Sequence, residues 1–358
     1  MGAVQHWCAT RRRAWEIAGL LALPFVLEAV LLGAAWREGI LGIDTRQSLL
    51  PAARFIRDGF SPFSRTHYPP LIPVILVPFT YVPSAAIVVS GLALAAVAAT
   101  LWALEVRDWR CYGAAFLWPP VFSGIQTANA TLFLVFASAL AWRYRDRTGA
   151  SAAAAGLAIA AKLISWPLVA WLAATGRKRG AVGAVAVAVT FSVGLGVLLE
   201  VALRHTDTAF GEIATSTGSP SYSVVDVSRS LGASTWVALV ALGALTLALV
   251  FLCVALGRRG DDVRSFSVAC LACLVGAPNV WLHTFAFILP IIALMRPRFS
   301  GAWLVPALFL VLPVTNPSAA DVTFAWLATG AVMLRLLGPP PFGRTQGVTR
   351  IVVRGPDS

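Results

Sequence analysis

Apolar runs follow one another along most of the chain, with only a few polar residues between them. Several runs are shorter than the ~20 residues that a perpendicular membrane helix needs, so tilted, paired or broken helices are expected among them. The pattern predicts an all-α, polytopic transmembrane bundle of about twelve spans. The predicted spans lie near 15–35, 84–104, 111–123, 129–142, 149–162, 163–176, 180–202, 234–257, 264–279, 282–295, 299–314 and 319–337.

A polar stretch over residues 37–71 follows the first apolar run directly. Within it, residues 48–57 have the spacing of a short amphipathic helix that lies on the membrane surface. Asp44 precedes this helix and either caps its N-terminus or acts as a general base at the membrane–water boundary; the two roles are compatible. The next apolar run contains Pro73 and Pro78, which argue against a regular span and for a re-entrant or surface helix.

The composition is that of a membrane protein, with 58% hydrophobic residues, 12% charged residues and a mean hydropathy of +0.78. Soluble domains carry about 25% charged residues. A net charge of +12 would suit nucleic acid only if the basic residues formed one continuous face. They lie instead in short clusters between apolar runs, as the positive-inside rule predicts. We therefore expect membrane lipids, and no nucleic acid, among the partners.

The basic clusters also predict the orientation. Arg11, Arg12 and Arg13 precede the first run, so this run is expected to be an uncleaved anchor with a cytoplasmic N-terminus. Placing every later cluster on the same side gives a multi-pass cell-membrane protein with both termini in the cytoplasm. We expect one integral membrane domain over residues 1–340, with outer loops at 36–83 and 203–233, and a disordered cytoplasmic tail at 341–358.

With this orientation most of the other polar residues fall on the outer face, which suggests an active site that opens outward. Lys162 ends an apolar run and either snorkels to the membrane surface or binds a phosphate. His283 starts a later span on the same face and is either an interfacial residue or a ligand-binding one. Several arginines of the first loop lie outside against the positive-inside rule, and anionic headgroups or a phosphate ligand would explain them.

Other motifs are weak. The chain contains no glycine-rich nucleotide-binding motif and no HExxH, and we expect neither a cofactor nor a metal. Cys270-x-x-Cys273 lies in an apolar run without a second pair, which favours helix packing over a redox or zinc site. Asn129-Ala130-Thr131 matches a glycosylation sequon but lies close to the membrane, and we discount it.

The motifs of the first loop are more specific when they are taken together. Asp44 follows the first span, and the segments Gly59-Phe60-Ser61-Pro62-Phe63 and Tyr68-Pro69-Pro70-Leu71 come next. This order resembles the GT-C class of membrane glycosyltransferases, in particular the α-(1→2)-mannosyltransferase-like branch, glycosyltransferase family 87. That family has an Asp after its first span, then G-x-P/S-P-Y/F, then Y-P-P-L.

Later motifs of the family match more loosely, and the similarity covers roughly residues 15–340. G-Q-x-N corresponds to the segment 124–129, which holds Gln126 and Asn129, and K-L-x-P to the segment 162–167, with two extra residues before Pro167. P-x-S-W-x-H-H is represented by Pro278, Trp281 and His283, with Thr284 in place of the second His.

The resemblance implies a polyprenyl-phosphate hexose donor, with mannose as the first expectation, and an extracytoplasmic lipid-linked or glycan acceptor. Phosphate is a good leaving group, so the transfer needs one base to take the acceptor proton and no general acid. A glycosidase, by contrast, uses a pair of carboxylates. We expect Asp44 to be this base in an inverting transfer that gives an α-linkage. The donor phosphate is expected at Lys162, His283, His67, Arg65 and Arg229, and other substrate contacts at Tyr68, Gln126, Asn129 and Trp281.

The alternative is a lipid or small-solute transporter or flippase, which would also need many spans and ionisable residues at membrane depth. Transporters often contain internal repeats with paired broken helices. The chain has no second copy of the pattern at 37–71, which favours the glycosyltransferase.

Overall fold

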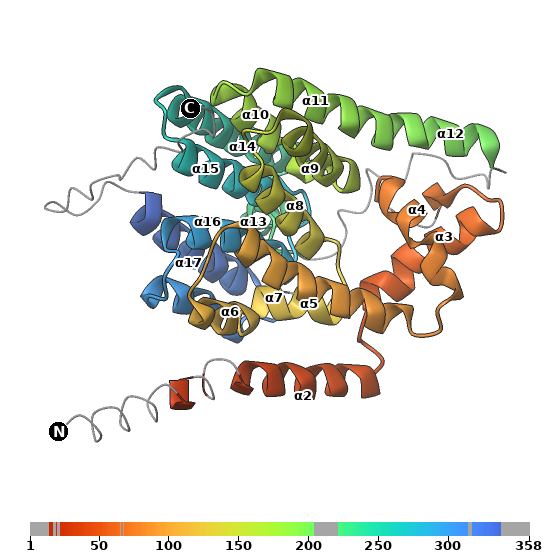
Figure 1. The fold of residues 1–358 in the computed structure, drawn as a ribbon, viewed down its shortest axis with the longest axis horizontal. Helices are drawn as coiled ribbons and strands as arrows, with labels where there is room; N and C mark the ends of the chain where they lie inside the picture. Colours follow the sequence, from red (N-terminus) through yellow and green to blue (C-terminus); the bar gives the residue numbers. More distant parts are fainter. Residues whose placement is uncertain are drawn as a thin grey trace, which may run out of the picture.

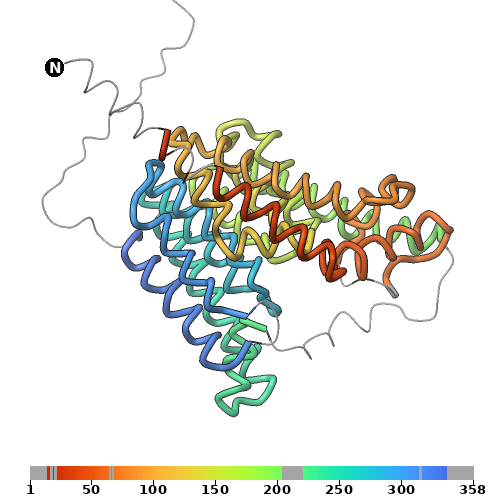
Figure 2. Tube along the Cα trace, turned by 90° about the horizontal axis from the view of Figure 1, so that it is seen from below, coloured from red at the N-terminus to blue at the C-terminus, as the bar shows by residue number. Residues whose placement is uncertain are grey.

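The structure is a computed structural model that describes residues 14–16, 19, 22–64, 66, 68–203, 221–313 and 317–337. Every regular element in these residues is a helix, which confirms the predicted all-α class. Two groups of helices diverge from a common region, one made by the chain up to residue 202 and the other by the chain from residue 224 onward (Figure 2).

The N-terminal part consists of one longer helix and a series of short ones (Figure 1). The short helices form the first loop and end before α5, so residues 72–82 do not form a regular span, as their prolines predict. The elements are α2 (Leu23–Arg37), the π-helix η2 (Thr45–Leu49), α3 (Leu50–Arg57), the 3-10 helix η3 (Pro62–Ser64), α4 (Leu71–Leu76) and the 3-10 helix η4 (Val77–Tyr81).

The central part is a set of helices that run back and forth between two ends of the molecule. α8 packs against α5 and α9, and α9 packs between α8 and α11. The elements are α5 (Ala85–Ala103), α6 (Trp109–Phe116), α7 (Pro119–Thr127), α8 (Thr131–Arg143), α9 (Thr148–Ala161), η5 (Leu163–Ser165), α10 (Pro167–Ala174), α11 (Lys178–Val189), the π-helix η6 (Thr190–Gly194) and α12 (Leu195–Ala202).

Helices α11 and α12 continue into each other and reach over the first loop (Figure 1). The hydroxyl of Ser61 in that loop donates to the carboxylate of Glu200 at 2.9 Å. The C-terminal part comprises α13 (Val224–Ser230), α14 (Thr235–Arg258), α15 (Asp262–Val275), η7 (Leu282–Phe287), α16 (Ile288–Met295), η8 (Gly301–Val311) and α17 (Ala319–Leu337).

The twelve predicted spans are not confirmed. By length and composition alone, four described helices are able to cross a membrane, over Ala85–Ala103, Lys178–Ala202, Thr235–Arg258 and Ala319–Leu336, or up to five if the bent pair α7–α8 counts as one. Several of the remaining runs correspond to helices of 8–14 residues. Much of α15 is buried inside the protein, and a helix in a protein core is as apolar as one in lipid. Cys270 and Cys273 lie there as fully buried free thiols, as expected for helix packing.

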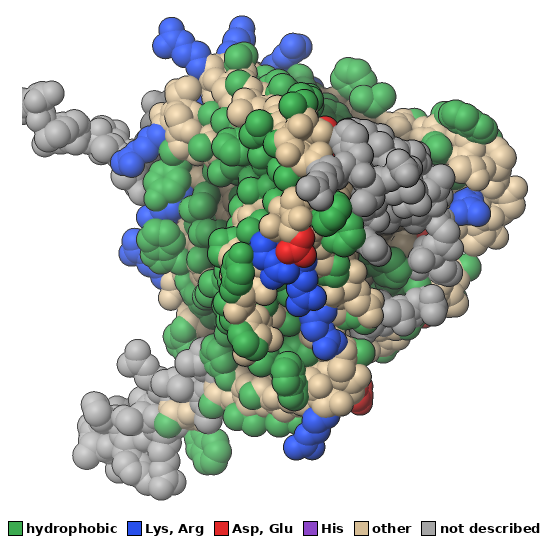
Figure 3. Space-filling view, turned by 90° about the vertical axis from the view of Figure 1, so that its right-hand side faces the viewer, with side chains coloured by type: hydrophobic (Ala, Val, Ile, Leu, Met, Phe, Trp, Pro, Cys, Tyr) green, Lys and Arg blue, Asp and Glu red, His purple; other side chains and the backbone are tan. Residues whose placement is uncertain are grey.

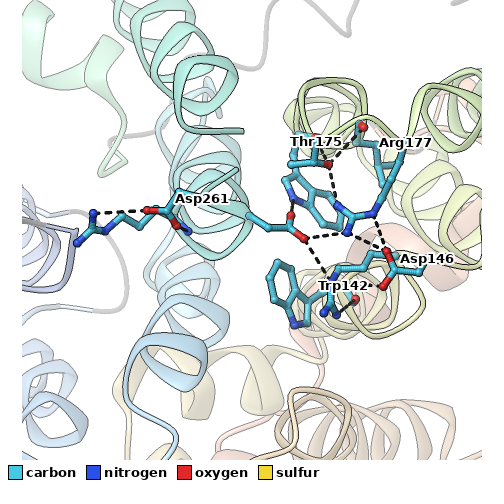
Figure 4. Close-up of polar contacts among 10 residues, drawn as sticks. Trp142, Asp146, Thr175, Arg177 and Asp261 are labelled. Carbon is cyan, nitrogen blue, oxygen red and sulfur yellow. Dashed lines mark hydrogen bonds and ion pairs between the residues drawn. The ribbon is translucent and has the colours of Figure 1, made fainter. Parts of the chain in front are cut away.

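Three basic clusters of the sequence meet at one end of the bundle: Arg143/Arg145/Arg147, Arg177/Lys178/Arg179 and Arg258/Arg259/Arg264. Here Arg145 and Arg177 pair with acidic residues in what we call the arginine network (Figure 4). Asp262, at the start of α15, accepts hydrogen bonds from Trp171 Nε1 at 2.7 Å and from the Arg177 guanidinium at 2.9 Å. Arg145 lies 3.3 Å from the same carboxylate, and Arg177 also pairs with Asp146 at 2.9 Å. The segments that follow α8, α10 and α14 therefore lie at the same end, as the orientation rule requires.

Candidate active site

Asp44 lies in the first turn of the helical stretch that leads through η2 into α3. This stretch is helical from residue 43, earlier than the sequence suggested, and Asp44 has helical dihedral angles (φ −64°, ψ −42°). An N-cap residue has extended dihedral angles instead, and the Asp44 carboxylate makes no capping hydrogen bond. The predicted cap is therefore wrong, and the carboxylate is directed at another part of the chain.

That part is the sharp turn between α7 and α8, whose axes differ in direction by 117°. Two hydrogen bonds hold the first loop to this turn, from Gly42 N to the Gln126 carbonyl at 2.7 Å and from Thr45 Oγ1 to the Ala128 carbonyl at 2.8 Å. Gly42 has a φ of +66°, and a Cβ there would lie 2.5 Å from the Cβ of Ala86. The close approach therefore requires glycine at this position.

Asn129 in the turn makes the direct contact with Asp44. Its amide nitrogen Nδ2 donates to Asp44 Oδ2 at 2.7 Å and to the Tyr68 hydroxyl at 3.3 Å. Its oxygen Oδ1 accepts from the backbone N–H and the hydroxyl of Thr131, at 2.8 and 2.7 Å. Asn129 and Thr131 are both buried, so Asn129 orients the carboxylate from inside the protein.

Lys162 approaches Tyr68 and Asp44 from the end of α9. It ends α9 in an extended conformation (φ −156°, ψ 119°), and the two extra residues of the K-L-x-P element are absorbed in η5 before Pro167 starts α10. The ammonium lies 5.7 Å from the centre of the Tyr68 ring. Asp44, Tyr68, Asn129 and Lys162 thus form one cluster, which we call the Asp44 cluster.

Two opposing effects act on the pKa of Asp44: burial, and the hydrogen bonds and positive charge around it. Burial raises the pKa of Asp44 above its ordinary value, whereas the hydrogen bond from Asn129, the nearby Thr127 hydroxyl and the charge of Lys162 oppose that rise. A carboxylate in such a setting is a candidate general base because it is both directed and partly desolvated.

His283 lies on η7, which packs against α7. It is close enough to feel the charge of Lys162, and its Nε2 is buried without a hydrogen-bond partner. Trp281 is half-buried and precedes the η7 turn, where its backbone N–H donates to the Thr284 hydroxyl at 3.2 Å. Thr284, in the place of the family's second His, is fully buried and stabilises this turn.

The other predicted site residues are placed less closely. Gln126 is half-buried near the end of α7 and contributes its backbone carbonyl to the contact with Gly42. Arg229 is exposed on α13, and the contacts within the Asp44 cluster do not involve it. Arg65 and His67 lie outside the described residues. No group of three or more His, Cys, Asp or Glu side chains among the described residues could hold a metal ion.

An apolar cavity of about 290 Å³ adjoins the Asp44 cluster. Its wall includes Ala128 and Ala161, the direct chain neighbours of Asn129 and Lys162. Ile75, Leu92 and Leu157 also line it and are partly exposed, so the cavity reaches the protein surface. Other lining residues come from α4, η4, α5, α8 and α9, among them Leu71, Ile72, Leu76, Phe79, Val89, Phe133 and Ala158.

Hydrophobic side chains cover much of the side of the molecule on which α3 and α4 lie (Figure 3). Basic side chains gather at the upper and left edges of this view and in a short run near its centre. This side of the molecule thus offers apolar surface suited to contact with lipid.

Thr131 is the member of the site that the sequence did not reveal as functional. The pattern Asn129-Ala130-Thr131 matches a glycosylation sequon, but in the structure Asn129 and Thr131 hydrogen-bond to each other. The available signal was the tendency of an Asn side chain to hydrogen-bond the backbone two residues further on.

Comparison with known proteins gives one match. The model of glycosyltransferase family 87 matches residues 66–284, which is more than half of the chain. No curated protein and no solved structure matches the chain. The matched range includes Tyr68, Asn129, Lys162 and His283 but begins after Asp44, so Asp44 is connected to it through the contact with Asn129.

Proposed function

The chain belongs to glycosyltransferase family 87, and on this basis we propose that it transfers a hexose from a polyprenyl-phosphate donor to an acceptor hydroxyl. Mannose is the first candidate for the sugar, and a lipid-linked or glycan acceptor on the extracytoplasmic side is the first candidate for the acceptor. Its apolar helices indicate that the enzyme is a membrane protein.

The observation that supports this donor is the junction between the apolar cavity and the Asp44 cluster. Ala161 lines the cavity, and the next residue, Lys162, carries a positive charge beside Asp44. A ligand with an apolar chain joined to a phosphate would place the chain in the cavity and the phosphate at Lys162. The cavity volume of about 290 Å³ is at the lower end of small-molecule sites, so it would hold only the isoprene units nearest the phosphate.

The proposed reaction is a single inverting displacement. The acceptor oxygen forms a bond to the anomeric carbon while Asp44 takes the proton of the acceptor hydroxyl. The bond between the anomeric carbon and the phosphate oxygen breaks, and its electron pair stays on the departing polyprenyl phosphate. Displacement on a β-linked donor gives an α-linked product.

Negative charge builds on the phosphate as it leaves, and Lys162 is placed to stabilise it. His283 is close enough to Lys162 to interact with its charge, and its buried Nε2 has no hydrogen-bond partner, so we propose it as the second phosphate contact. Arg65, His67 and Arg229 remain predictions for the same phosphate. Tyr68, Gln126 and Trp281 remain predictions for the sugar or the acceptor.

The test of this function uses the purified full chain in lipid vesicles with radiolabelled polyprenyl-phosphate mannose and a panel of membrane glycolipids. Asp44→Asn keeps the shape of the side chain and one oxygen that can accept from Asn129, but it cannot take the proton. We expect it to lower transfer by at least about 10²-fold.

The matched control is Asp58→Asn, because Asp58 is an exposed carboxylate in the same loop that pairs with Arg57 at 2.8 Å. It should leave transfer unchanged. Normal activity of Asp44→Asn would disprove the assignment of the base. Transfer from nucleotide sugars, with none from any polyprenyl-phosphate hexose, would disprove the donor class.

A further inference from the structure

The turn between α7 and α8 has an unusual backbone. Ala128 adopts the left-handed conformation (φ 51°, ψ 46°), which is strained for a non-glycine residue. It is fully buried, and its carbonyl accepts the Thr45 hydrogen bond. Conformations of this kind persist where the surrounding structure determines them, often at functional sites. This conformation points the next side chain, that of Asn129, at Asp44.

The orientation of the Asn129 carboxamide then decides what Asp44 faces. The two ends of a carboxamide are nearly equal in shape but opposite in hydrogen bonding. With Nδ2 toward Asp44, the carboxylate receives an N–H; with Oδ1 there, two acceptors would face each other. The Thr131 N–H and hydroxyl both donate to Oδ1, and with a reversed carboxamide the backbone N–H, which can only donate, would face the Nδ2 donor while the hydroxyl would lose its acceptor.

We propose that Thr131 is a positioning residue for the catalytic base: its backbone N–H and hydroxyl hold the Asn129 carboxamide in the one orientation that presents N–H groups to Asp44 and Tyr68. Thr131 does not touch Asp44 and acts only through Asn129. The proposal rests on the proposed role of Asp44 as the base.

The groups that face Asp44 define the expected effect. They are Asn129 from the turn, Thr127 from α7, Lys162 from the end of α9, and Tyr68 from the first loop, which also contacts Asn129. Removing the Thr131 hydroxyl leaves Oδ1 with one donor, so the carboxamide rotates more freely and its hydrogen bond to Asp44 weakens. Protonation of Asp44 should then occur at higher pH, while the contacts of Lys162 are unchanged.

The experiment compares Thr131→Val, which keeps the β-branched shape, with Thr131→Ser, which restores a hydroxyl. A hydrophobic carbodiimide reacts with protonated carboxyl groups, so the pH of half-maximal labelling of Asp44, measured by mass spectrometry on the full chain in lipid vesicles, reports its protonation without any substrate. We expect Thr131→Val to move this midpoint to higher pH and Thr131→Ser to return it toward the wild-type value. With polyprenyl-phosphate mannose, kcat should fall about fivefold, the effect of one hydrogen bond, with little change in donor KM.

Two controls separate positioning from a structural effect. Thr100→Val removes another fully buried helical hydroxyl, which donates to the Ala96 carbonyl at 2.7 Å, and it should not move the Asp44 midpoint. In an Asn129→Ala background, Thr131→Val should have no further effect, because the carboxamide through which it acts is gone.

An unchanged midpoint in Thr131→Val, or an equal shift in the Asn129→Ala background, would overturn the proposal. If Asp44→Asn retains transfer, the proposed function has failed, whatever the labelling shows. If Asp44→Asn is inactive and Thr131→Val behaves as wild type, only the positioning role is lost.

Discussion

The Asp44 carboxylate must be ionised to accept a proton, so its surroundings determine the pH range in which the enzyme works. Burial raises the pKa of Asp44, and Asn129, Thr127 and Lys162 lower it. Activity that depends on the ionised form is full above this pKa and is lost as the pH falls through it. The acid side of the pH–rate profile should therefore report the balance between burial and the charge of Lys162.

Lys162→Met tests this balance. Loss of the positive charge removes one of the effects that lower the pKa of Asp44, so the acid side of kcat/KM should move to higher pH. It also removes the proposed phosphate contact, and we expect donor KM to rise about 10- to 100-fold, as for the loss of a hydrogen bond to a charged group.

Lys178→Met is the matched control. Lys178 is the only other lysine of the chain and lies exposed at the start of α11, so Lys178→Met should leave both quantities unchanged. A change in acceptor KM alone for Lys162→Met would contradict the phosphate contact.

Asp44 and Lys162 could be singled out from the sequence because ionisable residues are rare in so apolar a chain. Their connection could not, since Asn129 is separated from Asp44 by 85 positions and depends on a left-handed turn at Ala128. Left-handed positions usually carry Gly or Asn, and an alanine gives no such signal. Thr131 was missed for the same reason: its role exists only once the turn has formed.

At the scale of helices, the helical class follows from composition and periodicity, but the number of spans does not. An apolar run indicates only that a segment is shielded from water, and it does not distinguish shielding by lipid from shielding by protein. α15 shows the second case, since residues 265–270 and 272–275 are all buried in the protein. A break inside the predicted span 111–123, between α6 and α7, also divides one apolar run into two helices.

Helices α9 and α11 are held together by close packing at small residues. A Cβ on Gly156 would lie 2.6 Å from the Cβ of Val187 and 2.7 Å from the Ala184 carbonyl, and one on Gly183 would lie 2.9 Å from the Cβ of Ala152. Small residues allow this approach and are the usual means of packing helices in membranes. Because α9 ends at Lys162, the contact also sets the position of the ammonium.

Gly156→Leu should force the two helices apart. Inserting side-chain atoms into a packed interface costs about 1–3 kcal/mol or more, so we expect a lower midpoint of thermal unfolding in detergent. Displacement of α9 should also raise donor KM. Gly149→Leu is the control in the same helix, because nothing lies within 4 Å of a Cβ there. Equal stability of the two variants would contradict close packing at Gly156.

At the scale of the whole molecule, the Asp44 cluster and the arginine network lie at opposite ends of the same helices. α8 runs from Thr131, two residues after Asn129, to Arg143 over 13 residues, and α9 returns from Thr148 to Ala161, the residue before Lys162, over 14 residues. At 1.5 Å per residue each helix is about 20 Å long. The α8–α9 hairpin thus separates the Asp44 cluster, which we propose faces outward, from the basic residues that we expect on the cytoplasmic side.

This arrangement predicts a difference in chemical labelling from the two sides of the membrane. Glu38 is exposed beside the first loop and Thr148 is exposed at the start of α9, at the ends of the molecule that carry Asp44 and the arginine network. In a Cys8→Ser background, where Cys111, Cys253, Cys270 and Cys273 are buried, a membrane-impermeant maleimide should label Glu38→Cys in intact cells. It should label Thr148→Cys only after the membrane is permeabilised, because the basic clusters beside Thr148 are expected to stay in the cytoplasm.

Labelling of both positions in intact cells would contradict a membrane between the two ends. The reverse pattern would place the Asp44 cluster in the cytoplasm and exclude an extracytoplasmic acceptor.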